Sequence, residues 1–125
     1  MIAPNRHVSV YVFSTPVDMR KSYDTLGAIV REHMMRNLLD GGVFLFVGKN
    51  RRRAKVLYWD GTGTCLFQKR LEKGRFAAPW KARRVDALVW TTSELALFLE
   101  GSEFVGRLPL SPPVWSPSER VITFK

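Results

Sequence analysis

Two short segments of partly alternating polarity flank a glycine-containing turn, and together they predict a β-hairpin. Residues 54–59 and 64–71 carry the β-branched, aromatic and alternating side chains typical of strands. The four residues between them, Asp60-Gly61-Thr62-Gly63, suit a tight turn because glycine supplies positive φ without steric cost. We therefore expect the two segments to pair antiparallel, with Asp60 opposite Gly63. This pairing fixes the face on which every hairpin side chain lies.

The predicted pairing sorts the hairpin side chains into two faces of different character. The face expected to lie in the core holds Val56, Tyr58, Cys65 and Phe67. The other face mixes cations, amides, aliphatic side chains and an aromatic ring: Lys55, Leu57, Trp59, Thr64, Leu66, Gln68 and Arg70. Such a mixture suits contacts to phosphates together with stacking on bases. It equally suits a face on which Leu57 and Trp59 lie under a helix while Lys55 and Arg70 extend their charged ends to water.

The remaining segments predict two helices and further strands. Residues 8–13 and 86–90 have strand composition, and residues 43–47 are apolar on both faces, which indicates a central strand. Ser22 or Asp24 is expected to begin a helix that continues to about Leu38. Its apolar side would carry Leu26, Ile29, Val30, His33 and Met34. A short second helix is expected from the capping box of Thr91 and Glu94 to Gly101.

These elements predict an α+β fold in a single domain: a mostly antiparallel sheet of four to five strands with one long and one short helix. We place this domain in residues 1–106. Residues 107–125 are expected to form a Pro-rich C-terminal tail, in which residues 121–124 either add a last strand or stay unattached. No internal repeat divides the chain, and 125 residues suffice for one core.

The positive charge of the chain lies in one contiguous third of the sequence. The net charge is +9. Residues 49–84 contain twelve Lys or Arg and two acidic residues, whereas the rest of the chain contains eight and nine. A focused positive field suits a polyanionic partner, above all nucleic acid. The alternative is a solvated basic surface without a specific partner.

Within this basic segment, two clusters are the strongest candidates for phosphate contact. The turn before the hairpin contains three successive arginines, which suit a grip on a phosphate backbone, although they would also serve as a solubilising turn. Lys69, Arg70, Lys73 and Arg75 extend the basic strip beyond the hairpin, with Leu71 and Phe76 expected to anchor it to the core. The candidate nucleic-acid-binding residues are Arg51, Arg52, Arg53, Lys55, Trp59, Lys69, Arg70, Lys73 and Arg75.

Catalytic chemistry finds no support in the sequence. His7 and His33 are isolated from any nucleophile, and the single cysteine, Cys65, lies within a predicted strand. No Cys or His pair has zinc spacing, and no phosphate-binding loop is present. We expect no enzyme activity, no catalytic residues, no metal, no cofactor and no small-molecule substrate. The lack of a signal peptide, of a membrane span and of paired cysteines predicts a cytoplasmic protein without membrane contact.

Several motifs in the same order resemble one known family. Asp18-Met19-Arg20-Lys21 within residues 15–26 resembles its opening motif, and residues 43–46 and 55–63 match its next block. Residues 67–76 match its Lys-Arg-Leu-Glu-x-Gly-Arg-Phe block, and residues 95–101 resemble its short helix. The family is the small accessory protein, called TnpB or the second open reading frame, of bacterial insertion sequence family sixty-six. The resemblance covers residues 8 to about 104.

The resemblance implies a non-catalytic role in DNA transposition beside a separate, larger transposase. Combined with the basic segment, it predicts an accessory protein that contacts the DNA of the element ends. The alternative is a protein-interaction module that binds the transposase of the same element without touching DNA. The turn at Arg51, Arg52 and Arg53 is more basic than the family pattern, and the Pro-rich tail is longer.

Overall fold

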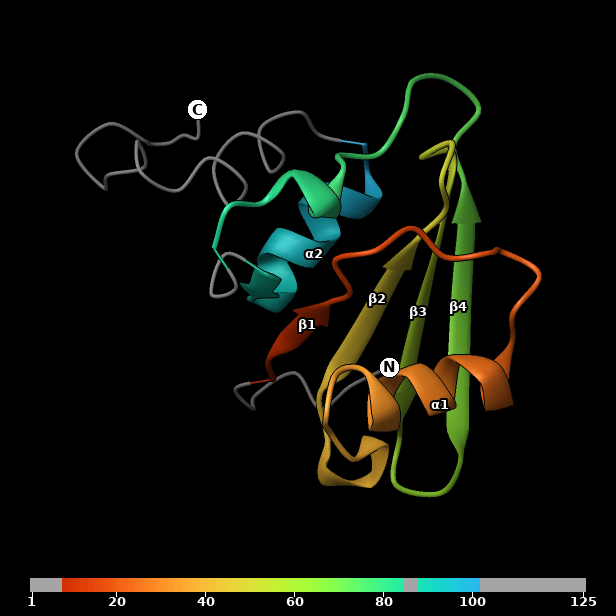
Figure 1. Cartoon of the computed structure of the whole chain (residues 1–125), viewed down its shortest axis with the longest axis vertical. Coiled ribbons are helices and arrows are strands. Elements are labelled where there is room, and N and C mark those ends of the chain that lie inside the picture. Colours follow the sequence, from red (N-terminus) through yellow and green to blue (C-terminus); the bar gives the residue numbers. More distant parts are fainter. Residues whose placement is uncertain (1–7, 85–87, 102–125) are drawn as a thin grey trace.

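A five-stranded sheet in the order β4-β3-β2-β1-β5 forms the centre of the protein (Figure 1). The computed structural model describes residues 8–84 and 88–101. The strands are β1 (Val10–Val12), β2 (Val43–Val47), β3 (Arg53–Trp59), β4 (Thr64–Arg70) and β5 (Val89–Trp90). β1 runs parallel to β2, and every other neighbouring pair is antiparallel. The predicted α+β class with a mostly antiparallel sheet is therefore confirmed.

The hairpin of β3 and β4 has the predicted register. Trp59 pairs with Thr64 and Lys55 pairs with Gln68, so the side chains are divided between the two faces as the sequence predicts. The prediction that Phe67 lies in the core is wrong, because Phe67 is 47% exposed on the edge strand β4. The Asp60 N–H donates to the Gly63 carbonyl at 3.1 Å, which closes the turn. The Asp60 carboxylate also accepts hydrogen bonds from the backbone N–H groups of Thr62 and Gly63, each at 2.9 Å. Gly61, at φ +104°, provides the left-handed backbone that the turn requires.

These turn contacts predict a pH dependence of stability. The hydrogen bonds from the backbone of Thr62 and then Gly63 lower the pKa of Asp60 from 3.8 to about 2. Because the folded state favours the ionised carboxylate, its contribution to stability is complete above about pH 4 and is lost as the pH falls towards 2. Urea unfolding of wild type and Asp60→Asn should therefore show a stability difference at neutral pH that is much smaller at about pH 2. An equal difference at both pH values would contradict this assignment, because asparagine accepts the same bonds but does not ionise.

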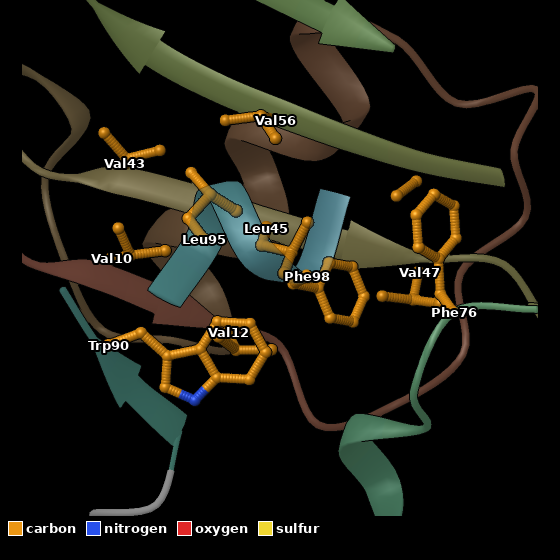
Figure 2. Packing of buried hydrophobic residues seen from close by; sticks show 11 residues of the cluster. Val10, Val12, Val43, Leu45, Val47, Val56, Phe76, Trp90, Leu95 and Phe98 are labelled. Carbon is orange, nitrogen blue, oxygen red and sulfur yellow. The ribbon is translucent and has the colours of Figure 1, made fainter. Parts of the chain in front are cut away.

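Each face of the sheet carries its own apolar cluster. The helix α1 (Tyr23–Glu32) contributes Leu26 and Val30 to the cluster on one face, where they meet three buried strand side chains, Phe44, Phe46 and Leu57. The helix α2 (Thr92–Leu99) contributes Leu95 and Phe98 to the cluster on the other face. Figure 2 shows these two side chains among those of the central strands. All five residues of β2 are buried, which confirms the predicted central strand.

The first helix ends earlier than the sequence predicts. α1 ends at Glu32, and Met35 adopts a left-handed backbone at φ 56°, which stops the helical path. The Arg36 N–H donates to the Val30 carbonyl at 3.0 Å and closes the end of the helix. A 3₁₀ turn, η1 (Leu38–Asp40), replaces the expected last turn, and His33 is exposed instead of lying on the apolar side.

The second helix begins as predicted. The Glu94 N–H donates to Thr91 Oγ1 at 3.1 Å, and Thr91 N–H donates to Glu94 Oε1 at 2.8 Å, so the capping box is confirmed. A 3₁₀ turn, η2 (Pro79–Lys81), lies between the hairpin and β5. The predicted Pro-rich tail at residues 107–125, and the possible strand within it, lie outside the described residues.

Candidate nucleic-acid interface

Two basic loops meet at the end of the sheet where β2 turns into β3. One is the turn of residues 48–52, and the other is the segment of residues 71–76 that follows β4; both lie at the upper end of the sheet in Figure 1. The Leu71 N–H donates to the Arg52 carbonyl at 2.8 Å, and Phe76 N–H donates to the Arg51 carbonyl at 2.6 Å. These backbone bonds hold the two loops side by side, although they are separated in the sequence by the whole hairpin.

The arginine turn has a defined backbone conformation. Gly48 N–H donates to the Arg53 carbonyl at 3.0 Å, and Arg51 N–H donates to the Gly48 carbonyl at 2.9 Å. Asn50 Oδ1 accepts from Arg52 N–H at 3.0 Å, and Arg51 takes the left-handed conformation at φ 62°. A turn fixed in this way presents its side chains with little loss of backbone entropy on binding.

The second loop is anchored to the core by one aromatic ring. Phe76 is buried and stacks on Phe98 of α2, with ring centroids 5.0 Å apart and planes 12° apart. Leu71 packs partly buried against the same cluster. The anchoring predicted for these two residues is confirmed, and it leaves Lys73 and Arg75 exposed between them.

The structure brings most of the predicted basic residues to this end of the sheet. We define the basic ridge as the cationic side chains of the two loops and of the adjoining strand ends: Lys49, Arg51, Arg52, Arg53, Lys69, Arg70, Lys73 and Arg75. Lys49 was absent from the predicted set, yet it lies exposed in the same turn as the arginines. The sequence signal that could have identified Lys49 is its position in the basic segment of residues 49–84. Arg51 and Lys69 are half-buried, and the other members are exposed.

Acidic side chains neutralise little of this ridge. In the part of the chain that the structure describes, one ion pair involves it, between Arg70 Nη2 and Glu72 Oε2 at 3.9 Å. Both side chains are largely exposed, and such surface pairs contribute little to stability. Arg53 and Arg70 lie directly opposite each other in the β3–β4 register, where like charges repel. The ridge therefore retains its positive field for an external anion.

Lys55 does not belong to the exposed surface on which it was predicted. Its side chain is 7% exposed, and its Nζ donates to the Lys21 carbonyl at 2.6 Å. The reason is that α1 and the segment leading into it cover this face of β3, where the neighbouring Leu57 is also buried.

Trp59 does not lie beside Arg70, although the two side chains share a face. Trp59 pairs with Thr64 at the turn end of the hairpin, whereas Arg70 pairs with Arg53 at the other end. Six residues of extended strand separate these positions, which corresponds to about 20 Å. Trp59 is half-buried. Base stacking on Trp59 and phosphate contact at the ridge would therefore occur at different places on the surface.

The cysteine has the properties of a structural thiol. Burial, followed by the hydrogen bond to Asp60 and the charge of that carboxylate, raises the pKa of Cys65 above its usual value. Its Sγ lies 3.4 Å from Asp60 Oδ2. A thiol held protonated is a poor nucleophile at neutral pH.

In the part of the chain that the structure describes, the carboxylates and histidines do not assemble into a metal site. Within residues 8–84 and 88–101, no three His, Cys, Asp or Glu side chains come together in a group that could hold a metal ion. We expect that DNA incubated with the protein and Mg²⁺ or Mn²⁺ stays intact, because nuclease chemistry of this kind needs a cluster of oxygen or nitrogen ligands. Gel analysis would detect cleavage, and cleavage abolished by Asp60→Ala would overturn the expectation.

None of the helices in the described ranges has the length and apolar character needed to cross a bilayer.

Comparison with known proteins finds a family model and relatives that each match most of this chain. A family model described as IS66 Orf2 like protein matches residues 8–107. The uncharacterized protein y4hO of Sinorhizobium fredii is 34% identical over 104 residues, covering 83% of this chain and 89% of that protein. The uncharacterized protein y4jC of the same organism is 33% identical over 115 residues, covering 90% and 97%. No solved structure gave a significant match.

Proposed function

This chain is a member of the IS66 Orf2-like family of insertion-sequence accessory proteins, and we propose that it serves transposition by holding element DNA along the basic ridge. The observation that carries the proposal is the pair of backbone hydrogen bonds that fixes the Arg51–Arg52 turn against the loop of Lys73 and Arg75. Two cationic loops held together at one end of the sheet form one continuous surface for phosphates.

The chemistry of the ridge fits a phosphate backbone better than it fits base recognition. Arginine offers a planar fork of donors that matches two oxygens of one phosphate, and lysine adds point charge. Phosphate contacts position a protein on DNA without reading its sequence. The ridge is therefore assigned to affinity and orientation on the DNA, with sequence choice left to the other components of transposition.

A gel-shift assay at two salt concentrations tests the proposal. Purified protein should retard both an element-end duplex and a scrambled duplex of equal length, because the contacts are to the backbone. Binding should weaken steeply at the higher salt concentration, since each neutralised phosphate releases condensed counterions. Absence of binding to either duplex at low salt would contradict the proposal.

A transposase-docking role is the second candidate, and one observation favours it. β4 forms one edge of the described sheet and carries Phe67, which is 47% exposed. Edge strands with exposed apolar side chains pair readily with a strand of another chain. If the gel shift is negative, co-purification of the transposase by wild type, and its loss in Phe67→Lys, would support this role.

A further inference from the structure

Lys55 combines deep burial with an incomplete set of partners. Among the described residues it is the one charged side chain classed as buried, with 7% of its surface exposed. An ammonium group has three hydrogens to donate, and the Lys21 carbonyl accepts one of them at 2.6 Å. Within the described ranges no carboxylate lies within 4.0 Å of its nitrogen. A buried cation without a counter-charge is unfavourable, so an anion bound beside Lys55 would stabilise the folded protein.

A pocket adjoins this side chain. It has a volume of about 280 Å³ and is lined by Met19, Arg53, Lys55, Gln68, Lys69 and Arg70. Liquid water occupies about 30 Å³ per molecule, so the pocket has room for a small tetrahedral anion with attached water.

The strand register concentrates positive charge at this pocket. Arg53 and Arg70 pair directly across β3 and β4, and Lys55 follows on the same face with Gln68 opposite it. Three cations and an amide therefore share one side of two neighbouring strands. Arg70 has Glu72 at 3.9 Å, an exposed and weakly held partner.

We propose that this pocket binds one phosphate group. Lys55 supplies charge from the buried side, and the guanidinium groups of Arg53 and Arg70 donate paired hydrogen bonds from the strand ends. Convergence of three cations favours a phosphate group over a carboxylate, because a phosphate offers more anionic oxygens for separate donors. The pocket takes either free phosphate or a phosphate of DNA, and the second source rests on the function proposed above.

Thermal unfolding in rising inorganic phosphate tests the pocket directly. Wild-type protein should gain about 4–8 °C in Tm at phosphate ten times its Kd, whereas potassium chloride of equal ionic strength should give no such rise. Lys55→Met keeps the length and apolar stem of the side chain but removes its charge, and should abolish the phosphate-dependent rise. Arg70→Gln tests the same pocket from the edge strand β4, and we expect it to leave folding intact because Arg70 is exposed.

Lys81→Gln is the matched control, because Lys81 is an exposed cation that does not line the pocket. This variant should keep the full rise in Tm. Two results would contradict the proposal that the pocket binds phosphate. One is a wild-type Tm that does not rise with phosphate, and the other is a rise in Tm that persists in both Lys55→Met and Arg70→Gln.

A DNA-binding assay on the same proteins separates the pocket from the proposed function. If wild type gains stability from phosphate but does not bind DNA, the phosphate-binding proposal is supported and the proposed DNA-binding function is contradicted. If the protein binds DNA but its Tm does not respond to phosphate, the DNA-binding function is supported and the phosphate-binding proposal is contradicted. Where both are observed, a weaker DNA affinity of Lys55→Met assigns a DNA phosphate to the pocket, and an unchanged affinity assigns free phosphate.

Discussion

Replacing Arg51, Arg52 and Arg53 together by alanine is expected to weaken DNA binding for all sequences alike. Each phosphate contact contributes about −0.9 to the slope of log Kobs against log salt concentration on duplex DNA, so three lost contacts should flatten the slope by about two to three units. The expected cause is lost charge and not a changed turn, because arginine and alanine both carry a Cβ at the left-handed position 51. Titrations at several salt concentrations measure the slope.

A charge-matched variant separates position from net charge. Arg31, Lys81 and Arg83 are exposed cations outside the ridge, and their joint replacement by alanine removes the same charge. This control should keep most of the salt slope. If the two triple variants bind equally well, the ridge is not the DNA site, and the transposase-docking role takes precedence.

Phe76→Ala is expected to cause the largest loss of stability among the ridge-supporting side chains. Phe76 is buried and stacks on Phe98, and truncation of such a ring costs about 3–5 kcal/mol in free energy of unfolding. Because the Phe76 N–H also donates to the Arg51 carbonyl, loss of the anchor should loosen the loop of Lys73 and Arg75 against the arginine turn. Urea unfolding followed by circular dichroism measures the loss.

Phe67→Ala supplies the comparison for this prediction. Its ring is 47% exposed on the edge strand β4, so its truncation should cost less than about 1 kcal/mol. Similar losses in both variants would mean that the ring of Phe76 is not the anchor that the stacking on Phe98 indicates.

The elements that the sequence predicted well have local signals. The Asp60-Gly61 turn set the hairpin register, and the all-apolar Val43–Val47 segment identified the central strand. The capping box at Thr91 located the start of α2. In each case the chemistry that determines the structure lies within a few residues of the place it determines.

The features that the sequence missed depend on contacts across the fold. The end of α1 rests on a left-handed methionine, Met35, where a glycine or proline would have marked the stop. Alternation placed Lys55 and Trp59 on one face, but which part of that face α1 and its leading segment cover follows only from the packing. Likewise the meeting of the two basic loops depends on backbone bonds between residues on either side of the hairpin.

The pairing of β1 with β5 forms late in the synthesis of the chain, because β5 follows the other four strands of the described sheet in the sequence. Val10 pairs with Trp90, so the outer edge of β1 has no strand partner until the residues up to Trp90 have left the ribosome. The hairpin and β2 pair over short separations and need not wait for it. A product truncated before Trp90 would expose the β1 backbone and the apolar surface that Trp90 covers. Frameshifts or stop codons shortly before the codon for Trp90 should therefore yield aggregated protein and not a shortened functional protein.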